Sequence, residues 1–163
     1  MKAIQKTRKI KVLGYPFAGG QGQSGVELTP SWLENQFWFK NMAKLSNGKI
    51  EYEEIKVSDP TSNHGKDTRA HLPGPRNELN VMKSSTELKR QTYNALREGY
   101  FPIVLGGDHS RAIGSIAGFK HMYPNDKILW LDAHLDANTP KSSPSGNAHG
   151  MPLSYLAGHV PLA

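Results

Sequence analysis

The sequence contains two short apolar runs, FPIVL at residues 101–105 and KILWLD at residues 127–132, each next to turn-forming or polar residues. Runs of this length are typical of strands buried in a parallel sheet. We interpret residues 9–14 and 50–57 as two further strands. Because helix-forming segments separate the four, we expect an α/β fold with a parallel sheet and helices on both of its faces.

The helices are predicted from their start and stop signals. Thr29-Pro30 favours a helix start, with a hydroxyl as N-cap and proline in the first turn, and Asn47-Gly48 favours a stop. The apolar residues between these points have helical spacing, and we expect Trp32 and Trp38 to lie in the core. Further helices are predicted at residues 78–98, at 110–121 with Ser110 as cap, and after Pro152, whereas residues 58–77 are predicted to form a long loop.

Composition excludes several classes of protein. A chain of 163 residues suits one domain, and 37% hydrophobic with 21% charged residues is ordinary for a globular protein. The absence of cysteine excludes thiol catalysis and thiolate metal ligands. The net charge of +6 is dispersed and lacks interleaved aromatic residues, and no apolar run is long enough to span a membrane. We therefore expect a cytoplasmic protein that binds neither nucleic acid nor membrane.

The strongest functional signal is Asp132-Ala133-His134-Leu135-Asp136, at the end of the fourth predicted strand. In extended backbone, side chains two positions apart point to the same side, so Asp132, His134 and Asp136 are expected to converge. Ala133 and Leu135 would then face away. Two carboxylates and an imidazole repel and desolvate one another unless a cation neutralises them. A solvated loop of charges fits the apolar strand poorly, and we predict a metal site.

A histidine that could join this group lies in Gly106-Gly107-Asp108-His109-Ser110, directly after the strand at residues 101–105. The glycines allow a sharp turn that presents His109 at the strand end, although a lone histidine there is more often a structural hydrogen bonder than a ligand. The combined oxygen and nitrogen ligands suit manganese and, less decisively, iron, cobalt or zinc. Crowding of such groups favours two ions that share a carboxylate.

A polar loop, Ser145-Gly146-Asn147-Ala148-His149-Gly150, is the third candidate. Its small residues let the backbone approach a ligand, and Ser145 and Asn147 offer polar contacts. His149 could reach into a cleft, or it could be a surface histidine on an ordinary turn. The glycine-rich loop at residues 19–22 lacks the Gly-Lys-Ser/Thr ending of a phosphate loop, so we do not assign it to nucleotide binding.

GGDHS at residues 106–110, DAHLDANTP at 132–140 and SGNAHGMP at 145–152 together resemble the signatures of the ureohydrolases, and those of the arginases most closely. GYPFAGGQGQSGVELTP at residues 14–30 resembles the arginase opening as well. The resemblance implies an arginase-like α/β fold and manganese-dependent hydrolysis of L-arginine to L-ornithine and urea by a metal-bridged hydroxide, as in the urea cycle. The complete family site holds two Mn²⁺ ions, and whether the chain forms a homo-oligomer stays open.

The resemblance also assigns roles to the metal-site residues. His109, Asp132 and Asp136 match ligands of one manganese ion. His134 matches a ligand of the second ion, with Asp132 bridging the two. Asp136 would in addition orient the attacking hydroxide, and His149 matches the residue that passes protons to the leaving amine or to water.

Substrate choice within the family depends on Asn138 and Ser145. They match positions that bind the amino-acid end of arginine, and agmatinases lack this combination because their substrates lack the α-amino-acid group. We therefore expect arginine as the small-molecule substrate, with His134, Asn138, Ser145 and Asn147 as substrate-binding residues. Another ureohydrolase such as an agmatinase is the alternative.

The family pattern includes a later Asp-x-Asp pair of metal ligands, which residues 1–163 do not contain. We therefore expect a ureohydrolase-like domain over residues 1–163 that is truncated on its C-terminal side and exposes an apolar sheet edge. The alternative to an enzyme is a non-catalytic remnant that binds metal weakly or associates with a partner chain. The isolated chain is expected to show little or no turnover.

Overall fold

The computed structural model describes residues 9–57 and 75–160, apart from the side chains of Trp38 and Ala43. Its sheet contains three strands, β1 (Ile10–Gly14), β2 (Ile50–Glu54) and β3 (Phe101–Leu105). They are parallel and lie in the order β2-β1-β3, so the first strand of the sequence is central. The predicted parallel sheet is confirmed.

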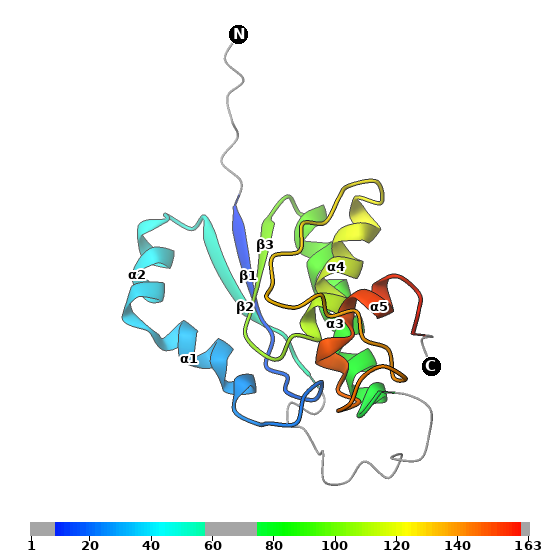
Figure 1. Ribbon diagram of the computed structural model, residues 1–163. Helices are drawn as coiled ribbons and strands as arrows, with labels where there is room; N and C mark the ends of the chain where they lie inside the picture. Colours follow the sequence, from blue (N-terminus) through cyan, green and yellow to red (C-terminus); the bar gives the residue numbers. More distant parts are fainter. Residues whose placement is uncertain (1–8, 58–74, 161–163) are drawn as a thin grey trace.

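Helices cover both sides of this sheet. Figure 1 shows the helices that precede β2 in the sequence on one side and those that follow it on the opposite side. In the described part of the chain, none of them is long and apolar enough to cross a membrane. Their bounds, with two short 3-10 helices, are η1 (Val26–Leu28), α1 (Thr29–Asn35), α2 (Phe37–Leu45), α3 (Glu78–Arg97), α4 (Arg111–Met122), η3 (Ala148–Gly150) and α5 (Pro152–Leu156).

Alternation along the strands explains the two layers. On one face, a Cβ atom at Gly14 would lie 2.9 Å from Pro30 of α1, and the ring of Tyr52 packs edge-on against Phe39 of α2, with 5.8 Å between the centroids. On the other face, Leu13 is fully buried in a core that includes Leu88 of α3. Because successive side chains of a strand point to opposite faces, one strand serves both layers.

Two glycines bring α4 unusually close to α3. A Cβ atom at Gly114 would lie 2.4 Å from the carbonyl oxygen of Ser85, and one at Gly118 would lie 2.6 Å from that of Lys89. The two helices therefore touch through their backbones, which only residues without a side chain allow. This contact positions the start of α4, which directly follows the turn that carries His109.

The predicted strand at residues 127–132 is wrong. No strand is assigned there in the described part of the chain, and Leu129 and Leu131 are 81% and 85% exposed. A strand exists only where a neighbour completes its ladder of hydrogen bonds, and apolar composition alone does not supply one. For the same reason β3 is parallel but not buried as predicted: it lies at an edge of the described sheet, and Phe101 is 51% exposed.

Smaller corrections concern the first helix and its caps. The helix predicted after Thr29 is divided at Gln36, whose backbone is extended, into α1 and α2. Trp32 is 61% exposed rather than in the core, because α1 turns Pro30 inward and the tryptophan outward. The N-cap of α1 is Leu28 rather than Thr29, and Ser110 is the N-cap of α4 but makes no side-chain capping hydrogen bond. The side chain of Trp38 and most of the predicted loop, residues 58–74, lie outside the described residues.

Candidate metal centre

The turn after β3 presents the first candidate ligand. Gly106 and Gly107 have φ angles of 78° and 67°, in the region that favours glycine. A Cβ atom at Gly107 would also lie 2.4 Å from the carbonyl oxygen of Tyr15, so the turn passes too close to the chain after β1 for any side chain. His109 therefore emerges at the carboxyl end of the sheet, where ligands bind in parallel α/β proteins.

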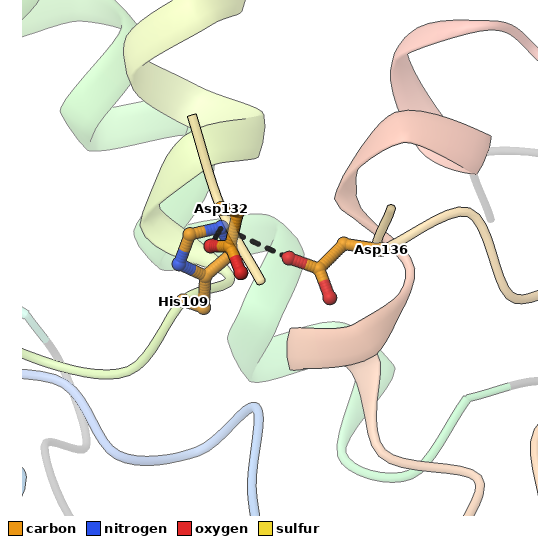
Figure 2. A group of neighbouring side chains, drawn as sticks. All are labelled: His109, Asp132 and Asp136. Carbon is orange, nitrogen blue, oxygen red and sulfur yellow. Dashed lines mark ion pairs between the residues drawn. The ribbon is translucent and has the colours of Figure 1, made fainter. Parts of the chain in front are cut away.

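Two carboxylates from a segment more than twenty residues later approach this histidine. Figure 2 shows the carboxylate of Asp132 close beside the His109 ring and the carboxylate of Asp136 pointing toward the same ring. Its Nε2 atom lies 3.2 Å from Asp136 Oδ2 and 3.6 Å from Asp132 Oδ2. One potential ligand atom from each of the three residues lies within 4.8 Å of the others, so the group could hold a metal ion.

The chemistry of this group fits a divalent cation. His109 Nε2 is buried and makes no hydrogen bond with any residue that the structure describes. The backbone N–H of His134 donates to Asp132 Oδ1 over 3.0 Å, and this bond, followed by the nearby imidazole of His109, holds the pKa of the Asp132 carboxyl below its usual range. A charged carboxylate and an imidazole nitrogen without another partner are the forms that bind a cation, and the sulfur-free donor set suits manganese among others.

The backbone at Asp136 replaces the expected extended conformation with a bend. Asp136 has a φ of 49°, and its carbonyl oxygen accepts a hydrogen bond from Leu153 N in α5 over 3.0 Å. Asp132 and Asp136 converge as predicted, and the predicted convergence is wrong for His134. The side chain of His134 is 82% exposed and lies outside the three-residue group, with Nδ1 3.7 Å from Asp132 Oδ1. Its role as a ligand stays a prediction.

The candidate residues nevertheless share one pocket. A cavity of about 740 Å³ lies at the carboxyl end of the sheet. Its lining includes all eight residues singled out from the sequence, which come from three separate stretches: His109, Asp132, His134, Asp136, Asn138, Ser145, Asn147 and His149. The structure thus brings the three motifs together, while the role of each residue stays a prediction.

The polar loop on the far wall of the pocket is held by its own hydrogen bonds. Asn138 N donates to the carbonyl oxygen of Gly150 over 3.1 Å, and Asn138 Oδ1 accepts from Ser142 Oγ over 3.1 Å. Asn147 N donates to Ser145 Oγ over 3.3 Å. These bonds fix the backbone that carries the candidate substrate-binding side chains.

Three residues near the site were not assigned a role from the sequence. The carbonyl oxygen of Gly20 accepts the backbone N–H of His149 over 2.9 Å and lies 3.1 Å from the ring Nδ1 of the same residue. Asp108, the middle residue of GGDHS, is buried beside Gly20. Trp130 packs edge-on against His109, with 5.3 Å between the ring centroids. Asp108 lies within the GGDHS motif and Gly20 within the stretch at residues 14–30, so both stood in recognised stretches, but neither stretch indicated the contact between them.

Known proteins resemble this chain along almost all of its length. The model of the Arginase family matches residues 8–162. The arginase of Staphylococcus aureus (strain COL) is 36% identical over 158 residues, which cover 97% of this chain and 51% of that protein. The native structure of the arginase from Bacillus caldovelox matches with a TM-score of 0.75 and 36% identity, over 93% of this chain and 49% of that one.

A third relative has been solved with a ligand. The arginase of Entamoeba histolytica in complex with L-ornithine matches with a TM-score of 0.75 and 30% identity, over 94% of this chain and 54% of that one. The chain thus spans about half the length of the relatives it matches. Agreement of the family model, of sequence and of fold leads to one conclusion: this chain belongs to the arginase family.

Proposed function

We propose that this chain supplies the first part of the active site of a manganese-dependent arginine hydrolase, which converts L-arginine and water into L-ornithine and urea. The observation that carries the proposal is the approach of Asp132 and Asp136 to His109 Nε2 in a pocket shared with the other motif residues. His109, Asp132 and Asp136 would hold the metal, joined by His134 once its exposed side chain turns inward. Bound manganese would supply Lewis acidity, which makes water a competent nucleophile near neutral pH.

The reaction needs two proton movements that residues of this chain can carry out. Water adds to the guanidinium carbon, the bond from this carbon to the side-chain nitrogen of the substrate breaks, and the departing amine gains a proton. Asp136 would orient the attacking water and accept its proton. His149, which lines the same pocket, would deliver a proton to the leaving nitrogen.

Arginine is proposed as substrate because the pocket wall carries Asn138, Ser145 and Asn147 within the same cavity. Their amide and hydroxyl groups suit the carboxylate and ammonium of an amino acid. The L-ornithine complex of the Entamoeba histolytica arginase supports this choice, since ornithine shares these groups with arginine. The substrate of an agmatinase lacks the α-amino-acid group that these contacts would bind.

Metal binding tests the site directly. Titration of the 163-residue chain with Mn²⁺, followed by calorimetry, is expected to show binding that Asp132→Asn weakens by at least about tenfold, because a neutral amide is a poor ligand. Asp126→Asn, an exposed residue outside the pocket, is the matched control and should bind like the wild type. Equal binding by Asp132→Asn and the wild type would contradict the assigned site.

Urea release tests the reaction. We expect little turnover of arginine by the isolated chain with Mn²⁺, and a clear gain after mixing with the part of the Staphylococcus aureus arginase that this chain does not cover. Asn138→Ala in the mixture should raise KM for arginine more than KM for agmatine. Faster hydrolysis of agmatine than of arginine would instead favour the agmatinase alternative.

A further inference from the structure

We propose that Asp108 is a positioning residue that sets the orientation and tautomer of His149 through the peptide groups of Gly20. The inference rests on the proposed function, since it concerns how His149 is prepared to move a proton. It extends that function to two residues that lie outside the metal-ligand group and the substrate-binding loop.

The first link is the carboxylate of Asp108. This side chain is 5% exposed and accepts two backbone hydrogen bonds: Gly20 N donates to Oδ2 over 2.7 Å, and Ser110 N donates to Oδ1 over 2.8 Å. In addition, Asp108 N donates to the carbonyl oxygen of Phe17 over 2.8 Å. Hydrogen bonds to a buried charged group are among the strong ones, so the loop after β1 is tied to the turn that carries His109.

The second link is the carbonyl group of Gly20. Its carbonyl oxygen receives the backbone N–H of His149 over 2.9 Å and faces the ring Nδ1 over 3.1 Å. A carbonyl oxygen can only accept, so Nδ1 must carry the proton in the neutral ring. Nε2 is then the unprotonated nitrogen, and it is the atom left to exchange a proton with a ligand in the pocket.

Glycine is required at the joint between the two links. A Cβ atom at Gly20 would lie 2.7 Å from Asp108 Oδ1 and 2.8 Å from Cβ of Ser110, closer than real Cβ contacts come. Gly20 is buried. Asn77 Nδ2 donates to the carbonyl oxygen of the neighbouring Gly19 over 3.1 Å, and this bond also fixes the loop that contains Gly20. Any side chain at position 20 would therefore push the loop away from Asp108 and carry the His149 acceptor with it.

Nuclear magnetic resonance of the histidine ring nitrogens tests the proposal on the full 163-residue chain without metal or substrate, so the outcome does not depend on the proposed reaction. At about pH 8, where an ordinary imidazole is neutral, we expect wild-type His149 in a single form protonated at Nδ1. A wild-type ring protonated mainly at Nε2, or one that exchanges between the two forms, would overturn the proposal without any variant.

Two variants then test whether Asp108 acts on His149 through Gly20. In Asp108→Asn only one of the two backbone donors can keep an oxygen acceptor, so we expect loss of the single tautomer. We also expect hydrogen-exchange protection of the His149 amide to fall by about tenfold. Gly20→Ala should produce the same change with the carboxylate retained. Asp126→Asn and Gly22→Ala, where a Cβ atom would meet only Asn147 Nδ2 at 3.8 Å, are the matched controls and should leave His149 unchanged. A folded Asp108→Asn protein with a wild-type His149 signal would refute the proposed role of Asp108.

Discussion

At the scale of single residues, burial changes the ionisation of a tyrosine near the site. Tyr15 follows β1 directly and is fully buried, with its phenol beside the side chains of Ser84, Ser85 and Ser110. Burial, aided by the nearby charge of Asp108, raises the pKa of the Tyr15 phenol far above its usual range. The folded chain thus holds this phenol in its neutral form.

We therefore predict that the folded chain loses stability at alkaline pH and that Tyr15→Phe reduces this loss. The phenol ionises near pH 10 in the unfolded chain but not in the folded chain. The free energy of unfolding is therefore unaffected by this group below about pH 10, and it falls above that pH by up to about 1.4 kcal/mol per pH unit. Urea unfolding of both proteins should show a shallower loss of stability above pH 10 in Tyr15→Phe, with similar values at neutral pH. Parallel curves would contradict the assignment.

At the same scale, the grouping of three candidate ligands could be predicted from the sequence. His109, Asp132 and Asp136 were found because carboxylates and imidazoles that gather at strand ends repel and desolvate one another unless a cation neutralises them. Gly20 was not, because its role depends on a contact with Asp108 from 88 residues away. Backbone groups carry no chemical signal in a sequence, so only the fold could show that one holds His149.

At the scale of elements, the contact between α3 and α4 is the most sensitive to side-chain size. Gly114→Ala would place a methyl group against the carbonyl oxygen of Ser85, which a rigid backbone cannot avoid. We expect a loss of about 1–3 kcal/mol in the free energy of unfolding, despite the better helix propensity of alanine. Ser115→Ala, on the neighbouring and half-buried position of α4, is the control and should change stability by less than about 0.5 kcal/mol. Equal effects would rule out close packing at Gly114.

The exposed apolar segment that follows α4 gives a second prediction. Leu129, Leu131 and Leu135 are 81%, 85% and 70% exposed, and contiguous apolar surface of this kind promotes self-association. The double variant Leu129→Lys with Leu131→Lys should remain monomeric in light scattering at concentrations where the wild type associates. Leu79→Lys removes an exposed leucine on α3 as control. If the control suppresses association equally, the segment is not its cause.

Local patterns predicted most elements and failed where a partner was needed. β1, α3 and α5 follow from periodicity, glycine stops and a leading proline, all of which act within a few residues. The run at residues 127–132 has the composition of a buried strand, but composition cannot state whether a neighbouring strand is present. Burial of β3 was overestimated for the same reason, because an edge position is a property of the sheet and not of the strand.

At the scale of the whole molecule, metal binding should change stability. An ion that binds only the folded chain stabilises it by about 2.7 kcal/mol at a free concentration 100 times its dissociation constant. For a chain of this size, that corresponds to a rise in melting temperature of roughly 5–10 °C. Differential scanning calorimetry with and without Mn²⁺ should show this rise, and a chelator should reverse it. Asp136→Asn is expected to remove most of the rise, and an unchanged rise would place the ion elsewhere.

The segment that carries Asp132 and Asp136 has no strand ladder of its own in the described part of the chain. A cation held by these carboxylates and by His109 would act as a cross-link, because it joins this segment to the turn after β3, and the binding free energy would offset the entropy lost in ordering the segment. A strand that pairs with this segment would order it beforehand. Ion and strand would then favour each other equally, since such coupling is reciprocal, and the affinity for Mn²⁺ would rise without a change in any ligand.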